Sequence, residues 1–161
     1  MFFFILYHCP FMKHFATYLL VTAVGLASLA SCKKDAETTP ALSKTDLLTA
    51  KSWKVTDIKV SGQSIYATPL FAACDKDDLV KFNASKSATF DEGTLKCDPT
   101  TPQSRTGSWD FTSSETKLKV TDPDGTVAEG TIGTLTSTTL IVTDPNGFGT
   151  GVAAEVTYTA Q

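Results

Sequence analysis

The stretch Gly107-Ser108-Trp109-Asp110-Phe111-Thr112, followed by Lys117-Leu118-Lys119-Val120-Thr121 and Asp122-Pro123-Asp124-Gly125, decides the fold. In both runs every second residue is apolar, which is the period of a strand with one buried face. Trp109 and Phe111 are therefore predicted to point inward, and the two lysines of the second run to point outward. The Pro-Asp-Gly sequence then predicts a hairpin turn, because its glycine supplies a positive φ.

The same alternation continues in both directions along the chain, with a short turn after almost every run. Consecutive short strands joined by tight turns predict an all-β fold, an up-and-down antiparallel barrel whose closure removes the exposed strand edges. Eight strands enclose an interior that side chains just fill, or that holds one small ligand. The predicted strands are Ser52–Val60, Leu79–Phe82, Ala88–Phe90, Gly107–Thr112, Lys117–Thr121, Thr126–Leu135, Thr139–Thr143 and Val152–Thr159.

A short helix is predicted before the first strand. Ser43 can cap the free N–H groups of a first turn, and Asp46 three residues later places negative charge near the positive helix end. Leu47 and Leu48 give the helix an apolar side, and it is expected to end near Ala50. In a barrel, such a helix can close one end.

Irregularities are expected at three places in the sheet. Ile58 and Val60 are out of phase with the start of their strand, which indicates either a bulge near Asp57 or a second face packed on another part of the protein. Gly133 lies inside another strand, where glycine can allow a bend. Asp144-Pro145-Asn146-Gly147 repeats the turn chemistry, and it is predicted to be part of a longer loop.

Upstream of the barrel, the apolar run Phe15–Leu26 leads into Leu29-Ala30-Ser31-Cys32, and a charged run follows. This arrangement resembles a bacterial lipobox at the end of a signal peptide, and the apolar run is short for a membrane-spanning helix, which needs roughly 20 residues. The resemblance implies that Cys32 is lipidated and becomes the new amino terminus. A membrane-spanning anchor with an incidental cysteine is the alternative.

This interpretation divides the chain into three parts. Residues 1–31 are predicted to be a lipoprotein signal peptide, residues 32–42 a flexible linker, and residues 43–161 the barrel domain. Because Met12 is followed by the basic residue that a signal peptide needs, translation is predicted to begin there. The expected location is the outer membrane, on its periplasmic face or at the cell surface, with the lipid of Cys32 holding the protein to the membrane.

Composition restricts the function further. The chain has a net charge of −3, and a mildly acidic balance argues against nucleic acid as a partner. Its only histidines, His8 and His14, lie in the predicted signal peptide, so the remainder lacks the usual general base near neutral pH. No base is paired with a nucleophile in the sequence. We therefore expect no enzyme activity, no cofactor and no metal.

Two cysteines of the barrel domain form an even pair. Cys74 and Cys97 are predicted to form a structural disulfide, because exported proteins reach an oxidising compartment. A reactive or metal-binding thiol pair is the alternative. Asp75, Asp77 and Asp78 could be calcium ligands, but the spacing lacks the glycine and distant glutamate of an EF-hand loop. A solvated entrance to a strand is the interpretation we favour.

An ordered set of residues suggests a family. The set is Leu47-Leu48-Thr49-Ala50-Lys51-Ser52-Trp53, Cys74, Asp77-Asp78, Phe82, Phe90, Gly93, Cys97, Gly107-Ser108-Trp109-Asp110-Phe111 and Leu118. It resembles the lipocalin-like domain of small Bacteroidota lipoproteins, over roughly Ser43 to Gln161. One departure is Lys51-Ser52-Trp53, where lipocalins often have Gly-x-Trp. The resemblance implies a calycin-type barrel and small apolar ligands, with no established reaction.

The candidate ligand-binding residues are those expected to line the interior or one mouth: Trp53, Phe82, Phe90, Arg105, Trp109, Phe111 and Tyr158. Arg105 is included because its guanidinium could meet an anionic headgroup. The alternative is that the aromatic residues are simply core and that Arg105 is a solvated loop residue.

Two functions follow from these residues. The first is a lipid-anchored protein that binds a small apolar or amphipathic molecule in the barrel or at its mouth. The second is an envelope interaction module with a filled barrel, whose loops bind a protein or glycan. For the second function the candidate surfaces are Ile65–Ala73 and Gly147–Gly151.

Overall fold

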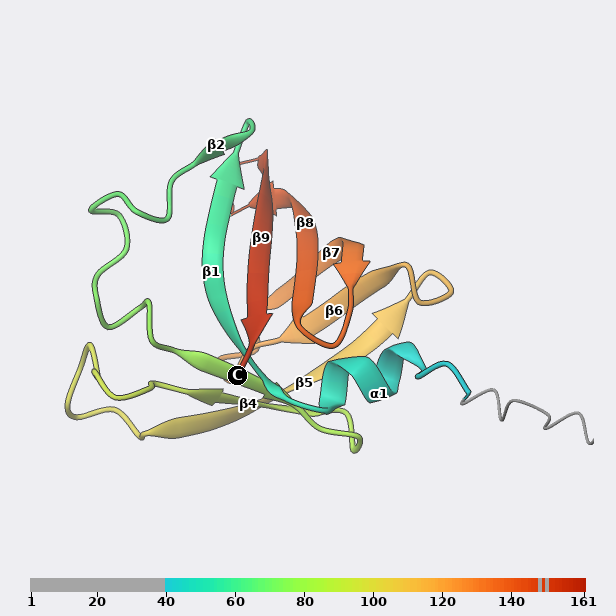
Figure 1. Ribbon diagram of the computed structural model, residues 1–161. Helices are drawn as coiled ribbons and strands as arrows, with labels where there is room; N and C mark the ends of the chain where they lie inside the picture. The colour runs from blue at the N-terminus through green and yellow to red at the C-terminus, as the bar shows by residue number, and fades with distance from the viewer. Residues whose placement is uncertain (1–39, 148, 150) are drawn as a thin grey trace, which may run out of the picture. The chain divides into compact units, whose positions relative to one another are not determined.

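A closed β-barrel forms the part of the chain described by the computed structural model, which covers residues 40–147, 149 and 151–161. Figure 1 shows the helix followed by strands that run up and down around the barrel. The elements are α1 (Lys44–Thr49), β1 (Ser52–Val60), β2 (Gln63–Ser64), β3 (Leu79–Phe82), β4 (Ser87–Asp91), β5 (Ser104–Thr112), β6 (Lys117–Thr121), β7 (Val127–Leu135), β8 (Thr139–Gly147) and β9 (Val152–Ala160).

The barrel closes where the first long strand meets the last. Every strand from β3 to β9 pairs antiparallel with its neighbour in sequence, and β1 pairs with both β3 and β9. In Figure 1 β1 and β9 lie side by side, although they come from opposite ends of the domain. The two-residue β2 only extends a hairpin from the end of β1. The predicted eight-stranded antiparallel barrel is therefore confirmed.

Helix α1 closes one end of the barrel, as predicted. Ser43 and Asp46 form a capping box, in which each side chain accepts a hydrogen bond from the other residue's backbone N–H. At the other end of the helix, the indole N–H of Trp53 donates to the Leu48 carbonyl at 2.8 Å, and Lys81 Nζ donates to the Thr49 carbonyl at 2.7 Å. The last two carbonyls of the helix are thereby satisfied by side chains of β1 and β3.

The half of the barrel next to α1 is filled. Trp109 packs edge-on against Phe82 and Phe111, with ring centroids 5.8 and 5.3 Å apart. The Lys86 ammonium lies 4.0 Å from the centroid of the Trp109 ring, a cation–π contact at the rim of this core. The buried residues are Leu48, Trp53, Phe82, Ala88, Trp109, Leu118 and Leu140.

Bulges interrupt three ladders, and one of them corrects a prediction. The register of β1 against β9 shifts between Val55 and Asp57, so Ile58 and Val60 return to the inner face as expected. The register of β7 against β8 shifts at Gly133. The predicted loop at residues 144–147 is wrong, because β8 continues to Gly147 with a bulge between Asp144 and its end. Pairing with β9 extends the strand beyond what the turn residues alone indicate.

Candidate ligand-binding site

The half of the barrel away from α1 contains a cavity of about 670 Å³. Its inner wall consists of side chains at alternate positions of β3, β4, β6, β8 and β9, which the pleat of a strand directs to one face. These wall residues are Val80, Phe82, Phe90, Leu118, Val120, Val142, Val156 and Tyr158. The volume lies within the range of small-molecule pockets, roughly 300–1,000 Å³.

Gly130 on β7 makes part of this space. A Cβ at this position would lie 2.3 Å from Val142 Cγ1 and 2.9 Å from the Thr143 carbonyl oxygen. The glycine therefore lets β7 and β8 approach each other without a side chain at the wall. It is one of the residues that line the cavity.

A smaller hollow of about 230 Å³ adjoins the cavity. The two share Val80, Phe90 and Tyr158 as lining residues. The smaller hollow adds Trp53 and Arg105, with acidic residues around them. Its walls therefore bring one cation and several carboxylates to the same apolar surface.

The structure divides the predicted ligand-binding residues into two groups. Five of them line one or both hollows: Trp53, Phe82, Phe90, Arg105 and Tyr158. Trp109 and Phe111 lie instead in the filled half, packed on each other. Trp53 and Phe82 also belong to the buried core, so the ligand-lining and the core interpretations overlap in these two residues.

Sequence reasoning assigned Asp122 and Asp144 only to turns. Both do serve turns: the Asp122 carbonyl accepts from the Gly125 N–H at 2.9 Å, and Asp144 Oδ1 accepts from the Asn146 N–H at 2.9 Å. Both also line the mouth of the large cavity. No local pattern in the sequence indicates this second role, because the two residues come from separate hairpins.

Tyr158 lies at the boundary between the apolar wall and this acidic mouth. Burial raises the pKa of its hydroxyl to about 12, and the negative charges of Asp122 and Asp144 add to the effect. The hydroxyl therefore remains protonated at every physiological pH. It can donate a hydrogen bond to a ligand inside the cavity.

Arg105 and Asp78 belong to the rim of the smaller hollow. Arg105 Nη2 lies 3.6 Å from Glu92 Oε1, so the guanidinium is already paired with a carboxylate. Partial burial raises the pKa of Asp78 to about 6, with Glu92, Asp77 and other carboxylates contributing. Negative charge is therefore crowded at this side of the barrel.

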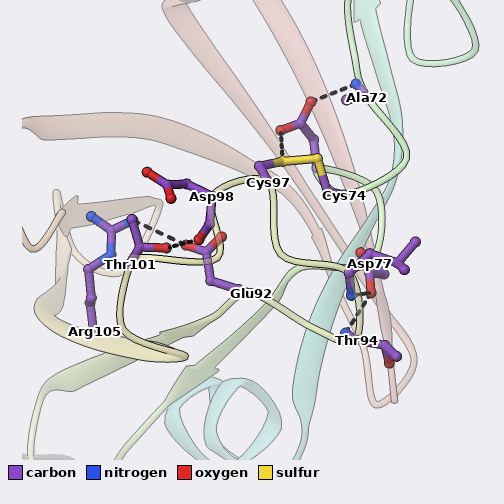
Figure 2. Close-up of a disulfide and its surroundings, with 11 residues drawn as sticks. Ala72, Cys74, Asp77, Glu92, Thr94, Cys97, Asp98, Thr101 and Arg105 are labelled. Atoms are coloured by element: carbon purple, nitrogen blue, oxygen red, sulfur yellow. Dashed lines mark hydrogen bonds and ion pairs between the residues drawn. A yellow bond between two sulfur atoms is a disulfide. The ribbon is translucent and has the colours of Figure 1, made fainter.

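The predicted disulfide joins the two long loops beside this rim. Cys74 and Cys97 are bonded, and their Cα atoms lie 5.2 Å apart. Figure 2 shows the disulfide with Asp77 of one loop directed at Thr94 of the other. The cysteines of the Cys74–Asp75–Cys97 group therefore have no thiolate to offer a metal.

The aspartates around the disulfide act as backbone acceptors. Asp77 Oδ2 accepts from the Thr94 and Leu95 N–H groups at 2.6 and 2.8 Å, and Asp75 Oδ2 accepts from the Ala72 N–H at 2.6 Å. The two Asp77 bonds fix one loop against the other, and the Asp75 bond closes a turn within its own loop. Asp75 and Asp77 thus bind the loop backbone, a role that the interpretation as a solvated strand entrance did not include.

The predicted lipidation site, Cys32, lies outside the described residues. The same holds for residues 1–31 and for most of the predicted linker. Within the described part of the chain, no helix has the length and apolar character needed to cross a membrane.

The closed antiparallel barrel with an open, apolar interior half defines a calycin-type fold. The family model of the lipocalin-like domain matches residues 49–142, more than half of the chain. The chain therefore belongs to the lipocalin-like domain family. A search of curated proteins finds no match to it.

Proposed function

We propose that this protein is a lipid-anchored binding protein that holds a small apolar or amphipathic ligand in the open half of its barrel. The observation that carries the proposal is the cavity of about 670 Å³, whose inner wall is apolar and whose mouth is polar. Most small-molecule sites combine a concave apolar surface with a few polar groups that orient the ligand. A barrel filled along its whole length would offer no such volume.

The binding proposal is tested with N-phenyl-1-naphthylamine, an uncharged apolar fluorophore. Trp53 and Trp109 are the only tryptophans of the chain, and both are buried in the barrel. Energy transfer from them to the bound fluorophore therefore reports binding in or near the barrel. We expect saturable transfer at micromolar protein.

Two neighbouring residues of β6 provide a matched pair of variants. Val120 lines the cavity, whereas Lys119 is exposed on the opposite face of the strand. Val120→Phe adds a ring inside the cavity and should weaken fluorophore binding by roughly tenfold or more. Lys119→Phe adds the same ring outside and should leave binding unchanged. Equal binding by both folded variants would exclude the cavity as the site.

The lipid anchor is proposed at Cys32, on the sequence pattern that precedes it. Metabolic labelling with an alkyne fatty acid should label the full chain, and Cys32→Ala should abolish the label. Cys9→Ala is the matched control, because Cys9 precedes the proposed start at Met12. Processing that continues in the presence of globomycin would contradict a lipoprotein signal peptide.

A second candidate function is supported by the exposure of apolar residues on the loops. Leu70 is 74% exposed and Leu95 is 52% exposed, and they belong to the two loops that the disulfide joins. Such residues can form the centre of a contact with an envelope protein or glycan. A partner captured by the wild-type chain and lost in Leu70→Glu would favour this function, provided that fluorophore binding is absent.

A further inference from the structure

The walls of both hollows carry an excess of negative charge. Among the described residues that line them, Arg105 is the only cation. The carboxylates that line them form what we call the acidic rim: Asp78, Asp91, Glu92, Asp122, Glu129 and Asp144. A polar group of a ligand that enters the cavity must pass or remain beside these residues.

Two members of the acidic rim are already in ion pairs. Glu129 Oε1 lies 3.0 Å from Lys117 Nζ, and Glu92 Oε1 lies 3.6 Å from the Arg105 guanidinium. Asp122 and Asp144 form no ion pair with any described residue. They are thus available to a charge brought by a ligand.

Asp122 and Asp144 line the same cavity as Tyr158, whose hydroxyl is a polar atom on the apolar wall. Both contribute to the raised pKa of the Tyr158 hydroxyl, after its burial, which means that both negative charges act on that group. Asp122 is itself partly buried; loss of hydration and the charge of Asp124 raise its pKa, while the positive charge of Arg105 lowers it. A carboxylate with poor hydration interacts more strongly with an opposite charge than one in bulk water does.

We propose that the cavity selects amphiphiles with a cationic head, an alkylammonium group placed between Asp122 and Asp144 with its apolar chain along the inner wall. This inference rests on the proposed binding function and names its ligand class. An anionic head would instead face two unpaired carboxylates. The guanidinium of Arg105 would attract such a head only by giving up Glu92.

The test is competition against bound N-phenyl-1-naphthylamine by three matched ligands: decylammonium, decanol and decanoate. All three have ten carbon atoms in a linear chain, so differences in the competing concentration mainly report the head group. At pH 7.5 and low ionic strength, decylammonium should displace the fluorophore at a concentration roughly tenfold below that of decanol, with decanoate the weakest. The difference should shrink at high salt, because screening weakens the attraction.

Charge-removing variants test whether the two named carboxylates are responsible. Asp122→Asn with Asp144→Asn should remove the preference for decylammonium and leave decanol binding unchanged. Glu115→Gln is the control, because it removes one negative charge from an exposed turn at the α1 end of the barrel. The single variants Asp122→Asn and Asp144→Asn each change the net charge by the same amount as this control, and comparing them with it separates an effect of the rim from an effect of net charge.

The outcomes distinguish the two proposals. If the fluorophore binds but decanol or decanoate competes as well as decylammonium, the inference is overturned while the binding function stands. If the double variant keeps the preference, the inference is overturned as well. A preference for decanoate that disappears in Arg105→Gln would establish the anionic-head alternative. If the fluorophore does not bind at all, the proposed function fails, and the inference fails with it.

Discussion

At the residue scale, Gly93 occupies a position where a neighbouring loop leaves no room for any side chain. It has φ +65°, and a Cβ there would lie 2.4 Å from the Asp77 carbonyl oxygen and 2.6 Å from its carboxylate. The same carboxylate accepts the N–H groups of Thr94 and Leu95. The glycine thus lets the two loops that the disulfide joins lie in direct contact.

We predict that Gly93→Ala lowers the free energy of unfolding by roughly 2–4 kcal/mol, because it adds a clash to the strain of a left-handed backbone. Gly62→Ala is the matched control, since Gly62 has φ +77° with no atom within 4 Å of a built Cβ. The control should cost only about 1 kcal/mol. Urea denaturation measures both, and equal costs would show that contact with Asp77 is unimportant.

The raised pKa of Asp78 makes stability depend on pH. Loss of hydration is the main cause, followed by Glu92 and Asp77, and the pKa rises from 3.8 to about 6. The folded state therefore binds this proton more tightly than the unfolded chain does. Protonation of Asp78 should therefore increase the stability of the folded protein as the pH falls from 7.5 through about 6 toward 4.

We predict that Asp78→Asn removes this contribution, because the amide has the same shape and does not titrate in this range. The variant should be more stable than wild type at pH 7.5, and the difference should disappear near pH 4. Thermal melts across this pH range measure the effect. If the stability difference between wild type and Asp78→Asn stayed constant across this pH range, the raised pKa would not belong to Asp78.

At the element scale, α1 illustrates how a short helix is held by the barrel. Six residues are too few for a stable isolated helix in water. Its capping box, the hydrogen bonds from Trp53 and Lys81, and the complete burial of Leu48 compensate for this. Most of the stability of the helix therefore comes from contact with the barrel.

Leu48→Ala should lower the free energy of unfolding by about 2–5 kcal/mol, since it leaves a cavity beneath the helix. Leu42→Ala is the control, because Leu42 is 64% exposed just before the helix, and its replacement should change stability by less than about 0.5 kcal/mol. Guanidinium denaturation compares them. Similar effects for both leucines would mean that α1 does not close the barrel in solution.

The disulfide is an element-scale constraint that lies outside the ladders. It closes a loop with a sequence separation of 23 residues, which predicts a stabilisation of about 3 kcal/mol. We expect Cys74→Ser with Cys97→Ser to lower the unfolding free energy by about this amount while β-sheet circular dichroism persists. Mass spectrometry of the oxidised wild-type protein should detect no free thiol at either position; two free thiols would refute the bond.

At the scale of the whole molecule, the β1–β9 ladder decides whether the sheet is a barrel or an open layer. It pairs Trp53 with Ala160 at one end and Val60 with Ala154 at the other. This ladder separates the apolar interior from solvent and gives β1 and β9 a shared partner edge. The other edge of β1 is paired only at its two ends, with β3 and with β2. The cavity exists only because this ladder closes.

Amide hydrogen exchange provides the corresponding measurement. The paired amides of β1 and β9 should be as strongly protected as those of the β4–β5 ladder, because both belong to one cooperative sheet. The amides of β2, whose two residues are exposed, should exchange much faster. Rapid exchange of the β9 amides that pair with β1 would contradict a closed barrel in solution.

The sequence by itself determined the strands, the helix cap, the bulge near Asp57 and the pairing of Cys74 with Cys97. The strands, the cap and the bulge depend on residues close together in the chain, so alternation and capping chemistry predict them. The disulfide is predictable because the barrel domain has only two cysteines to pair. The strand boundaries are less well predicted where a ladder extends a strand, as it does at residues 144–147.

Only the tertiary structure decided where the barrel is filled and where it is hollow. Trp109 and Phe111 have the same inward alternation as Phe90 and Tyr158, yet only the second pair lines the cavity. Their places in the closed barrel separate the two pairs, and no local pattern records those places. The gathering of Asp122, Asp144 and Tyr158 around one cavity likewise depends on barrel closure, which brings two separate hairpins together.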